Sequence, residues 1–515
     1  MFILGFSGMR FKARVSLVAA LFTALMPFQT VLASGSGPLD LNLPSLGATA
    51  GTELSPSDER ALGAHIMTQV RADPTFMSDP ETTEYLNRIG YQLVSRAKTY
   101  TYQFLFFPIR DQSLNAFALP GGYIAVHSGT IIAAKSESEL AGVMGHEIGH
   151  VSQRHIARMI EGQKSNLAIS LGSILLAILA ARAGGDSGGH AAAAIAMGSQ
   201  AAMIQNQLNF SQDAEREADR IGLQTLYNAG FDPEGMLSFF KRLQSNNRFY
   251  ESAAPAYLST HPLTVARMAD IENRIRHLPP RMHSDSLDFK LIQMRLKVLQ
   301  ETRHDRWFAV QKELARQAKS VKGKDAAILH YGLSVAATQL HQPEEAYRHA
   351  KLAMAAGSSA FLEKNLIRTQ YDAAVKTKST VERRNAITRA EKSLDKFPLS
   401  ALMAENYIDL LYEEGRHKEL IEFMRNGSAI GKSAPDYHAI LARSYEALGQ
   451  KSLQYLHTGE MYALMGVTEA AVYQMDLAEK ANDGDFYTMS EIDARLRDLR
   501  NQLLIEKDRG LPLAE

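Results

Sequence analysis

The feature that most constrains this chain is the pentapeptide His146-Glu147-Ile148-Gly149-His150. On an α-helix, residues four positions apart lie on one face, so both imidazoles project to the same side. Two neutral imidazoles in this arrangement supply half of a tetrahedral zinc site, and the adjacent glutamate can polarise a metal-bound water. The alternative is an ordinary helix with two histidines on its surface.

The residues around this motif favour the metal site. Leu140, Val143, Met144 and Ile148 recur at helical spacing, which predicts that the helix is buried. Histidine and glutamate side chains in a protein interior need partners, because burying an unsatisfied polar group is costly. A metal ion would provide such a partner.

Charge and cysteine content exclude several kinds of function. Lys+Arg and Asp+Glu both number 56, so the formal net charge is zero, and this balance gives no sign of a nucleic-acid partner. The chain has no cysteine, which excludes disulfides and thiolate metal sites. Any metal ligands must therefore be His, Asp or Glu. The length of 515 residues is enough for roughly two to four domains.

The N-terminal segment has the pattern of an export signal rather than of a folded element. A basic stretch at 10–14 precedes an apolar run that ends in small residues at Ala33. We therefore expect a signal peptide over 1–33, cleaved near Ala33, and a linker over 34–52. An exported chain without cysteine suits the periplasm. A retained membrane anchor is the alternative.

A pair of acidic residues further along the chain offers the missing metal ligand. Glu215 and Asp219 are four residues apart, so they share one face of a second helix. Glu215 can complete a His/His/Glu site, and Asp219 can accept a hydrogen bond from the ring N–H of a ligating histidine. Glu217 points to another part of the helix, which predicts a surface position. For this pair alone, a solvated acidic face is the alternative.

The segments before the motif predict a small sheet. Helices are expected over 55–70 and 81–97, and strands over 100–108 and 123–127, with a turn between the strands that ends in Gly121-Gly122. An edge strand of such a sheet can hold a peptide substrate by backbone hydrogen bonds.

The segment 167–203 is apolar and is interrupted by a glycine-rich stretch at 184–189. Its first apolar run is shorter than the roughly 20 residues that a membrane-spanning helix needs. We expect a buried helical hairpin here. A lid over the site and a segment in peripheral contact with a membrane are the alternatives.

The pattern changes after Pro279-Pro280 to helices without strands. Gly415 and Gly449 lie between paired helices and are one 34-residue tetratricopeptide period apart, although the tryptophan usual in that repeat is missing. Stacked helix pairs of this kind form a superhelix with a concave peptide-binding face. We therefore expect an α+β metalloprotease domain over 53–280 and an all-α tetratricopeptide-like domain over 281–515. An irregular helical bundle is the alternative for the second domain.

As a set, these motifs resemble the gluzincin family that includes the CAAX prenyl proteases and the heat-shock membrane protease. The resemblance covers residues 55 to about 275 and rests on four short motifs and one arginine: Asn115-Ala116-Phe117, His146-Glu147-x-x-His150, Glu215-x-x-Ala218-Asp219, Thr260-His261-Pro262 and Arg267. The exported signal and the helical C-terminal region are similar to one soluble branch of that family.

The resemblance implies the roles of the site residues. It implies one zinc ion per chain held by His146, His150 and Glu215, with Glu147 as the catalytic base and Asp219 behind a ligand. The loop histidine, His261, resembles one that can approach the metal. A histidine that merely caps the chain before Pro262 is the alternative, and whether His261 inhibits or assists is open. Candidates to contact the substrate or its oxyanion are His261, Arg267 and Asn115.

By resemblance, the chain is an exported zinc endopeptidase in the quality control and assembly of outer-membrane beta-barrel proteins. Its expected partners are unfolded or misassembled outer-membrane proteins, and the beta-barrel assembly machinery reached through the repeat domain. Two alternatives remain: a chaperone-like scaffold with little proteolysis, and a protease anchored in the inner membrane. An intact Glu147 disfavours the scaffold, because a structural zinc site needs no adjacent base.

Overall fold

The computed structural model describes residues 55–97, 102–162, 211–247, 256–427, 431–432 and 434–508. The predicted signal peptide, the linker and the apolar segment 167–203 lie outside these residues. Two compact units divide the chain: a larger one, Thr49–Ala429, and a smaller one that contains Ile430–Glu515.

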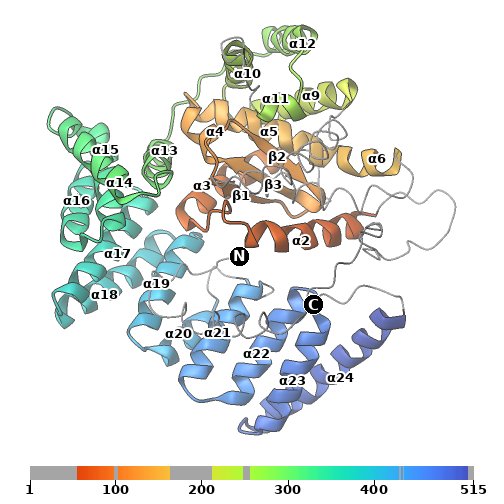
Figure 1. The fold of residues 1–515 in the computed structure, drawn as a ribbon, viewed down its shortest axis with the longest axis vertical. Helices are drawn as coiled ribbons and strands as arrows, with labels where there is room; N and C mark the ends of the chain where they lie inside the picture. Colours follow the sequence, from red (N-terminus) through yellow and green to blue (C-terminus); the bar gives the residue numbers. More distant parts are fainter. Residues whose placement is uncertain are drawn as a thin grey trace, which may run out of the picture. The chain divides into compact units, whose positions relative to one another are not determined.

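The larger unit is built on a three-stranded mixed sheet with strand order β1-β3-β2 (Figure 1). β1 runs parallel to β3, and β2 runs antiparallel to it, so β2 is an edge strand among the residues that the structure describes. A short helical turn, η1, connects β2 to β3. The bounds are β1 Leu105–Ile109, β2 Ala116–Leu119, η1 Pro120–Gly122 and β3 Tyr123–His127.

Successive side chains of a strand point to opposite faces of the sheet, so the three strands contribute to two separate hydrophobic cores. On one face, Phe107, Ala125 and their neighbours pack against α2 (Pro56–Ala72). On the other face, Phe106, Ile124 and Val126 belong to the main core with α3 (Pro80–Val94) and α5 (Glu137–Ser152). The sheet is thus covered on both faces by helices.

Helices α5 and α9 (Gln212–Asn228) cross at unusually close range. A Cβ atom added to Gly149 would lie 2.8 Å from the carbonyl oxygen of Ala218, and one added to Gly222 would lie 2.8 Å from the backbone nitrogen of His146. Only glycine fits such a contact between backbones. The close crossing brings the start of α9 over the H-E-x-x-H face of α5.

The other helices that the structure describes in the larger unit follow in sequence. In the first part they are α4 Ser128–Ala133, α6 His155–Gly162, α10 Glu234–Asn247, α11 Ala256–Thr260 and α12 Val265–Arg276. The later ones, which alternate with short turns, are α13 Leu287–Leu299, α14 His304–Gln317, α15 Gly323–Gln339, α16 Pro343–Ala356, α17 Ala360–Lys376, α18 Thr380–Lys396, α19 Ala401–Glu413 and α20 His417–Arg425.

The described part of the smaller unit consists of four helices, α21 Pro435–Ala447, α22 Lys451–Leu464, α23 Thr468–Ala481 and α24 Phe486–Asp508. Leu456, Ala471, Met475 and Leu496 form its core. Gly449, between α21 and α22, has φ of 74°, and Gly415, between α19 and α20 of the larger unit, has φ of 69°. These left-handed turns are the ones that the sequence pattern placed between helix pairs.

The expected fold class is confirmed: a helical domain with a small sheet precedes an all-helical region. The division into domains stays a prediction. The main hydrophobic core continues past residue 280, from Met77 to Leu402, and the division between compact units falls near residue 430 instead. One reason is visible at the start of α3, where Asp79 pairs with Arg295 of α13 at 2.5 Å and ties the first helices to the later ones.

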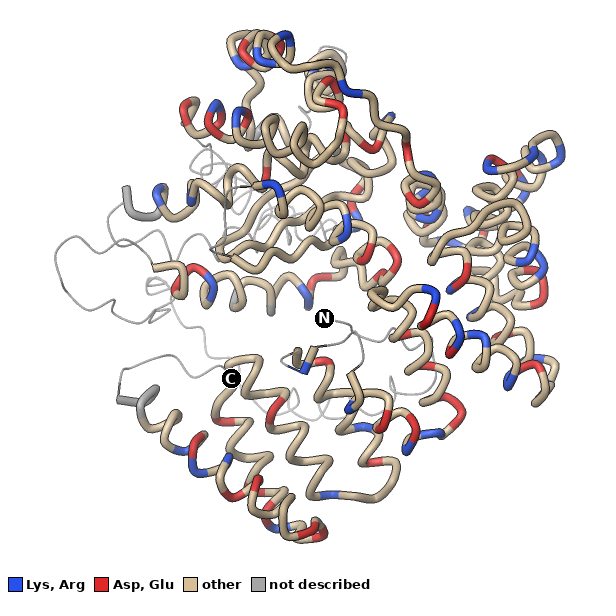
Figure 2. Tube along the Cα trace, turned by 180° about the vertical axis from the view of Figure 1, so that it is seen from behind, with Lys and Arg blue, Asp and Glu red and all other residues tan. Residues whose placement is uncertain are grey.

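The distribution of charged and of apolar residues along the described helices bears on possible partners. Figure 2 shows acidic and basic residues interspersed along the helices, in keeping with the zero net charge. Among the described residues, we find no helix that combines the length and the apolar character needed to cross a membrane.

Candidate metal centre

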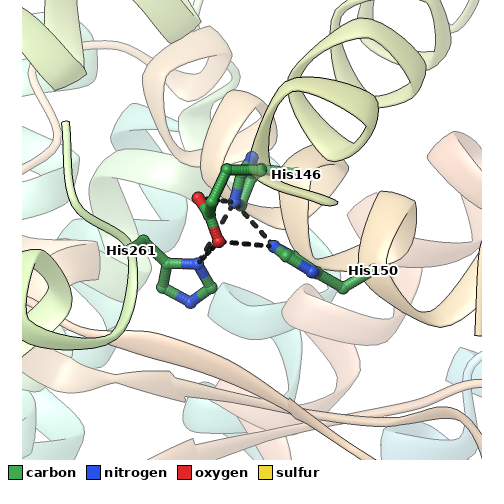
Figure 3. A group of neighbouring side chains, drawn as sticks. His146, His150 and His261 are labelled. Carbon is green, nitrogen blue, oxygen red and sulfur yellow. Dashed lines mark hydrogen bonds and ion pairs between the residues drawn. The ribbon is translucent and has the colours of Figure 1, made fainter. Parts of the chain in front are cut away.

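Four side chains from three parts of the larger unit converge on one buried point (Figure 3). His146 and His150 project from one face of α5, Glu215 lies in the first turn of α9, and His261 directly follows α11. Their ligand atoms all lie within 4.8 Å of one another, and none of the four residues is more than 1% exposed. The expected grouping of His146, His150 and Glu215 is therefore present, with His261 as a fourth member.

The spacing of these atoms fits a tetrahedral metal. Ligands at zinc bond lengths would lie about 3.3 Å from one another. Nε2 of His146 lies 3.0 Å from Nε2 of His150 and 3.5 Å from Oε2 of Glu215. Nδ1 of His261 lies 3.4 Å from Nε2 of His146 and 2.9 Å from Oε1 of Glu215. The donor set and its dimensions thus suit zinc, whose ligands are nitrogen and oxygen here.

A second layer of charges holds the ligands from behind. Oδ1 of Asp219 lies 2.9 Å from Nδ1 of His146, the position predicted for it. Arg267 donates from Nε and Nη2 to Asp219, each at 2.7 Å, and its Nη1 lies 2.6 Å from Oε2 of Glu215. Nη1 also donates to the carbonyl oxygen of Pro262. The guanidinium of Arg267 thus lies directly behind the ligands, and its expected role toward an oxyanion stays a prediction.

Glu147 lies beside the cluster and is not among the ligands. It is 1% exposed, and its Oε1 lies 3.6 Å from Nε2 of His261. Burial raises the pKa of Glu147, although the charges of His261 and His146 and a hydrogen bond from the backbone of Ala118 oppose that change. A more basic carboxylate suits proton transfer near neutral pH. The contact with Ala118 also places Glu147 next to the edge strand β2.

The ligands differ in the protonation that their surroundings favour. Burial disfavours the charged form of His146, but hydrogen bonds to Asp219 and Glu215 raise its pKa to about 9 for the protein side chains alone. Burial lowers the pKa of His150 well below its usual value. Burial would raise the pKa of Glu215, yet His261 and the other histidines hold it far below its usual range. The centre thus keeps its glutamate ionised and ready to bind a cation.

Asn115 lies just before β2, as its motif suggested. Its backbone N–H donates to Oγ1 of Thr130, which in turn donates to the Asn115 carbonyl oxygen. The side-chain Oδ1 is buried and has no hydrogen-bond partner among the described residues. The expected role of Asn115 toward a substrate stays a prediction.

Two residues at the centre were missed from the sequence. Tyr257 stacks on His261, with ring centroids 4.6 Å apart, and burial raises its pKa well above 10, which keeps the hydroxyl protonated. His155 contacts His150 from behind, and Glu217, expected on the surface, contacts His155. The available signals were the position of Tyr257 four residues before His261, and that of His155 five residues after His150.

Comparison with known proteins places this geometry in a family. Residues 80–275 match the Peptidase family M48. The beta-barrel assembly-enhancing protease of Escherichia coli strain K12 is 31% identical over 465 residues, which cover 89% of this chain and 91% of that protein. The chain belongs to peptidase family M48.

Other relatives agree with the M48 assignment. A putative beta-barrel assembly-enhancing protease of Vibrio cholerae is 42% identical over 260 residues, or 50% of this chain and 52% of that protein. The metalloprotease LoiP of Escherichia coli is 28% identical over 268 residues, or 51% of this chain and 97% of that protein. As an M48 protein with this ligand cluster, the chain is a metalloendopeptidase, which confirms the predicted enzyme class.

Proposed function

We propose that this M48 endopeptidase uses zinc, works in the periplasm, and cleaves unfolded or misassembled outer-membrane beta-barrel proteins. The observation that carries the chemistry is the buried cluster of His146, His150, Glu215 and His261 beside Glu147. The names of two relatives, the beta-barrel assembly-enhancing protease of Escherichia coli and the putative one of Vibrio cholerae, support the class of client.

The geometry assigns a task to each part of the centre. His146, His150 and Glu215 would hold the zinc ion, which when bound supplies a Lewis acid and an activated water. Glu147 takes the proton from the attacking water and later gives it to the leaving amine. An extended peptide would add to the sheet as a further strand beside the edge strand β2. Ala118, in this strand, also contacts Glu147, so the peptide would pass beside the base.

His261 is the proposed restraint on this activity. Its Nδ1 lies among the ligand atoms, at distances of 2.9 and 3.4 Å from Glu215 and His146. A neutral imidazole there can take the fourth position at the metal in place of water. The stacked ring of Tyr257 supports His261 in this orientation. A client could displace the ring, because the exchange replaces one ligand by another.

The proposed docking role of the later helices rests on their arrangement in pairs. Consecutive helices from α15 to α19 and from α21 to α23 pack against each other. Stacked pairs of this type commonly bind peptides or partner proteins. We extend the proposal to docking on the beta-barrel assembly machinery. A chain that ends near residue 430, where the two compact units divide, would test the part of α21–α24 in docking through co-purification with that machinery, and undiminished association would contradict that part.

Replacing Glu147 by Gln tests the chemistry. Because Glu147 is not a ligand, Glu147→Gln should keep one zinc per chain and lose about 10²- to 10⁴-fold in the rate of cleavage of an unfolded outer-membrane protein. His146→Ala should lose metal and activity together. Glu272→Gln is a control, since Glu272 is an exposed glutamate on α12. Full turnover by Glu147→Gln would show that the mechanism is wrong.

A further inference from the structure

A buried histidine outside the family motifs lies directly behind one of the metal ligands. His155 is the first residue of α6 and is 4% exposed. Its Nδ1 lies 3.0 Å from Nδ1 of His150, with the ring centroids 5.0 Å apart and the planes at 75°. Its other nitrogen, Nε2, lies 3.1 Å from Oε2 of Glu217 on α9. A chain of polar contacts thus runs from Glu217 through His155 to His150.

The place of His150 in the cluster fixes the direction of these hydrogen bonds. Nε2 of His150 faces the cluster, 3.0 Å from His146 and 3.4 Å from Glu215. An imidazole that binds a metal through Nε2 carries its proton on Nδ1. That proton points at Nδ1 of His155, which must accept it through a lone pair. His155 consequently carries its own proton on Nε2 and donates it to the Glu217 carboxylate.

The turn before α6 holds His155 in place. Arg154 joins α5 to α6 with φ of 54°, a left-handed conformation that is uncommon for a residue with a side chain. Its guanidinium donates from Nε to Glu59 of α2 at 2.7 Å. Strain of this kind persists where the surrounding contacts over-determine the backbone. The turn places His155, the first residue of α6, against the nitrogen of His150 that faces away from the cluster.

The two histidine ligands on α5 therefore have different supports. His146 faces Asp219, an anion buried together with Arg267. His150 faces a neutral imidazole whose far partner, Glu217, has a side chain that is 33% exposed. Hydrogen-bond partners behind a ligating histidine fix its orientation and raise its basicity, and their loss weakens metal binding.

We propose that His155 is a positioning residue for the metal ligand His150, and that Glu217 acts through His155 on metal affinity. The inference rests on the proposed zinc function of the cluster. It adds a route by which a partly exposed carboxylate on α9 reaches the metal. Substitutions along this route should weaken zinc binding without removing a ligand.

Zinc affinity, measured by competition with a chromogenic chelator on the full chain, tests the role of His155. His155→Phe keeps an aromatic ring but removes the acceptor, and should weaken zinc binding about 10- to 100-fold. His155→Asn places an amide oxygen where Nδ1 lies and should restore most of the affinity. Arg158→Gln is the matched control. It removes the exposed partner of Glu217, 3.2 Å away, and should leave zinc affinity unchanged.

Two measurements separate positioning from a purely structural role. The thermal unfolding midpoint of the metal-free protein should be similar for His155→Phe and His155→Asn, whereas the absorption spectrum of the Co²⁺-loaded protein should change in the Phe variant alone. Equal zinc affinity of the Phe variant, the Asn variant and the unchanged chain would overturn the inference. An unchanged chain that binds no zinc would overturn the proposed function as well, so the two failures are distinguishable.

Glu217 provides a second pair of variants, which tests the inference even if His155→Phe does not fold. Glu217→Gln keeps an oxygen acceptor for the Nε2–H of His155, and Glu217→Leu removes it. Zinc should bind several-fold more weakly to the Leu variant than to the Gln variant. Equal affinities for the two would show that Glu217 has no influence on the metal, contrary to the inference.

Discussion

The metal centre and the later helix pairs differ in how far apart in the sequence their contacting residues lie. At the centre, His146 meets His261 although 115 residues separate them. Within a helix pair, contacts are local: Ser334 donates to the carbonyl oxygen of Ala346, and Tyr407 donates to Glu419, in each case across 12 residues. A change at the centre should therefore act on several elements at once, whereas a change in a helix pair should remain within its neighbours.

Replacing His261, the fourth member of the cluster, is the sharpest test of this difference between the metal centre and the helix pairs. His261→Ala should raise cleavage of casein and self-cleavage several-fold while zinc remains on the other three ligands, because the position that the ring covers becomes open to water. If His261 instead stabilised the oxyanion, the rate would fall by about 100-fold or more. Slower cleavage with zinc retained would contradict the restraint.

A buried ion pair between Asp79, before α3, and Arg295 of α13 joins the first helices to the later ones. Burial would raise the pKa of Asp79, but the charge of Arg295 holds it below 3.8. The native carboxylate therefore stabilises the fold above pH 3.8, and this contribution is lost as the pH falls through the lowered pKa. Asp79→Asn should cost about 2 kcal/mol in urea unfolding at pH 7. The difference from the unchanged chain should vanish in strong acid, and a constant difference would argue against the ion pair.

Two glycines allow a direct comparison of the regions. A Cβ at Gly149 would lie 2.8 Å from the backbone of Ala218, so Gly149→Ala must push α5 and α9 apart, at a cost of about 2–3 kcal/mol. Gly415 has φ of 69° and no atom within 4 Å of an added Cβ, so Gly415→Ala should cost only about 1 kcal/mol, for the left-handed backbone. Gly149→Ala should also weaken zinc binding. If Gly149→Ala and Gly415→Ala changed zinc affinity equally, the expected difference between the metal centre and the helix pairs would be wrong.

A buried carboxylate among the later helices should give the smallest change. Burial, and then the charge of Asp409, raise the pKa of Glu405 well above its usual value. The folded state therefore prefers the protonated form, so its stability falls as the pH rises above 4.5. Glu405→Gln should raise the unfolding temperature modestly at pH 7, and the gain should disappear at pH 4. Cleavage should be unaffected, and an altered rate would show coupling to the centre.

What the sequence predicted about the centre depended on local spacing. Four-residue steps put His146 with His150 and Glu215 with Asp219 on shared helix faces, and the structure shows both pairs together. The strand at 123–127 also lies where the alternation of residues placed it. Such features follow from helix and strand periodicity, which is independent of the rest of the chain.

Other contacts depended on how distant elements pack, and spacing does not contain that information. The contacts of Arg267 with Asp219 and Glu215 were not predicted, because they depend on how α12 packs against α9. Glu217 is partly exposed, in keeping with its expected surface position, but its contact with His155 of α6 was not predicted. The boundary at 280 marks a change in composition, but the core crosses it.

The edge strand β2 beside Glu147 sets a condition on what can be cut. In the proposed binding mode, a chain segment reaches the base by forming backbone hydrogen bonds with the sheet, so it would have to arrive extended and with its own N–H and C=O groups unpaired. A segment that is already part of a helix or a closed barrel has no unpaired backbone groups for such hydrogen bonds. Selection would then depend on time as well as on sequence. Segments that pair quickly would escape, and those that remain unpaired would be cut.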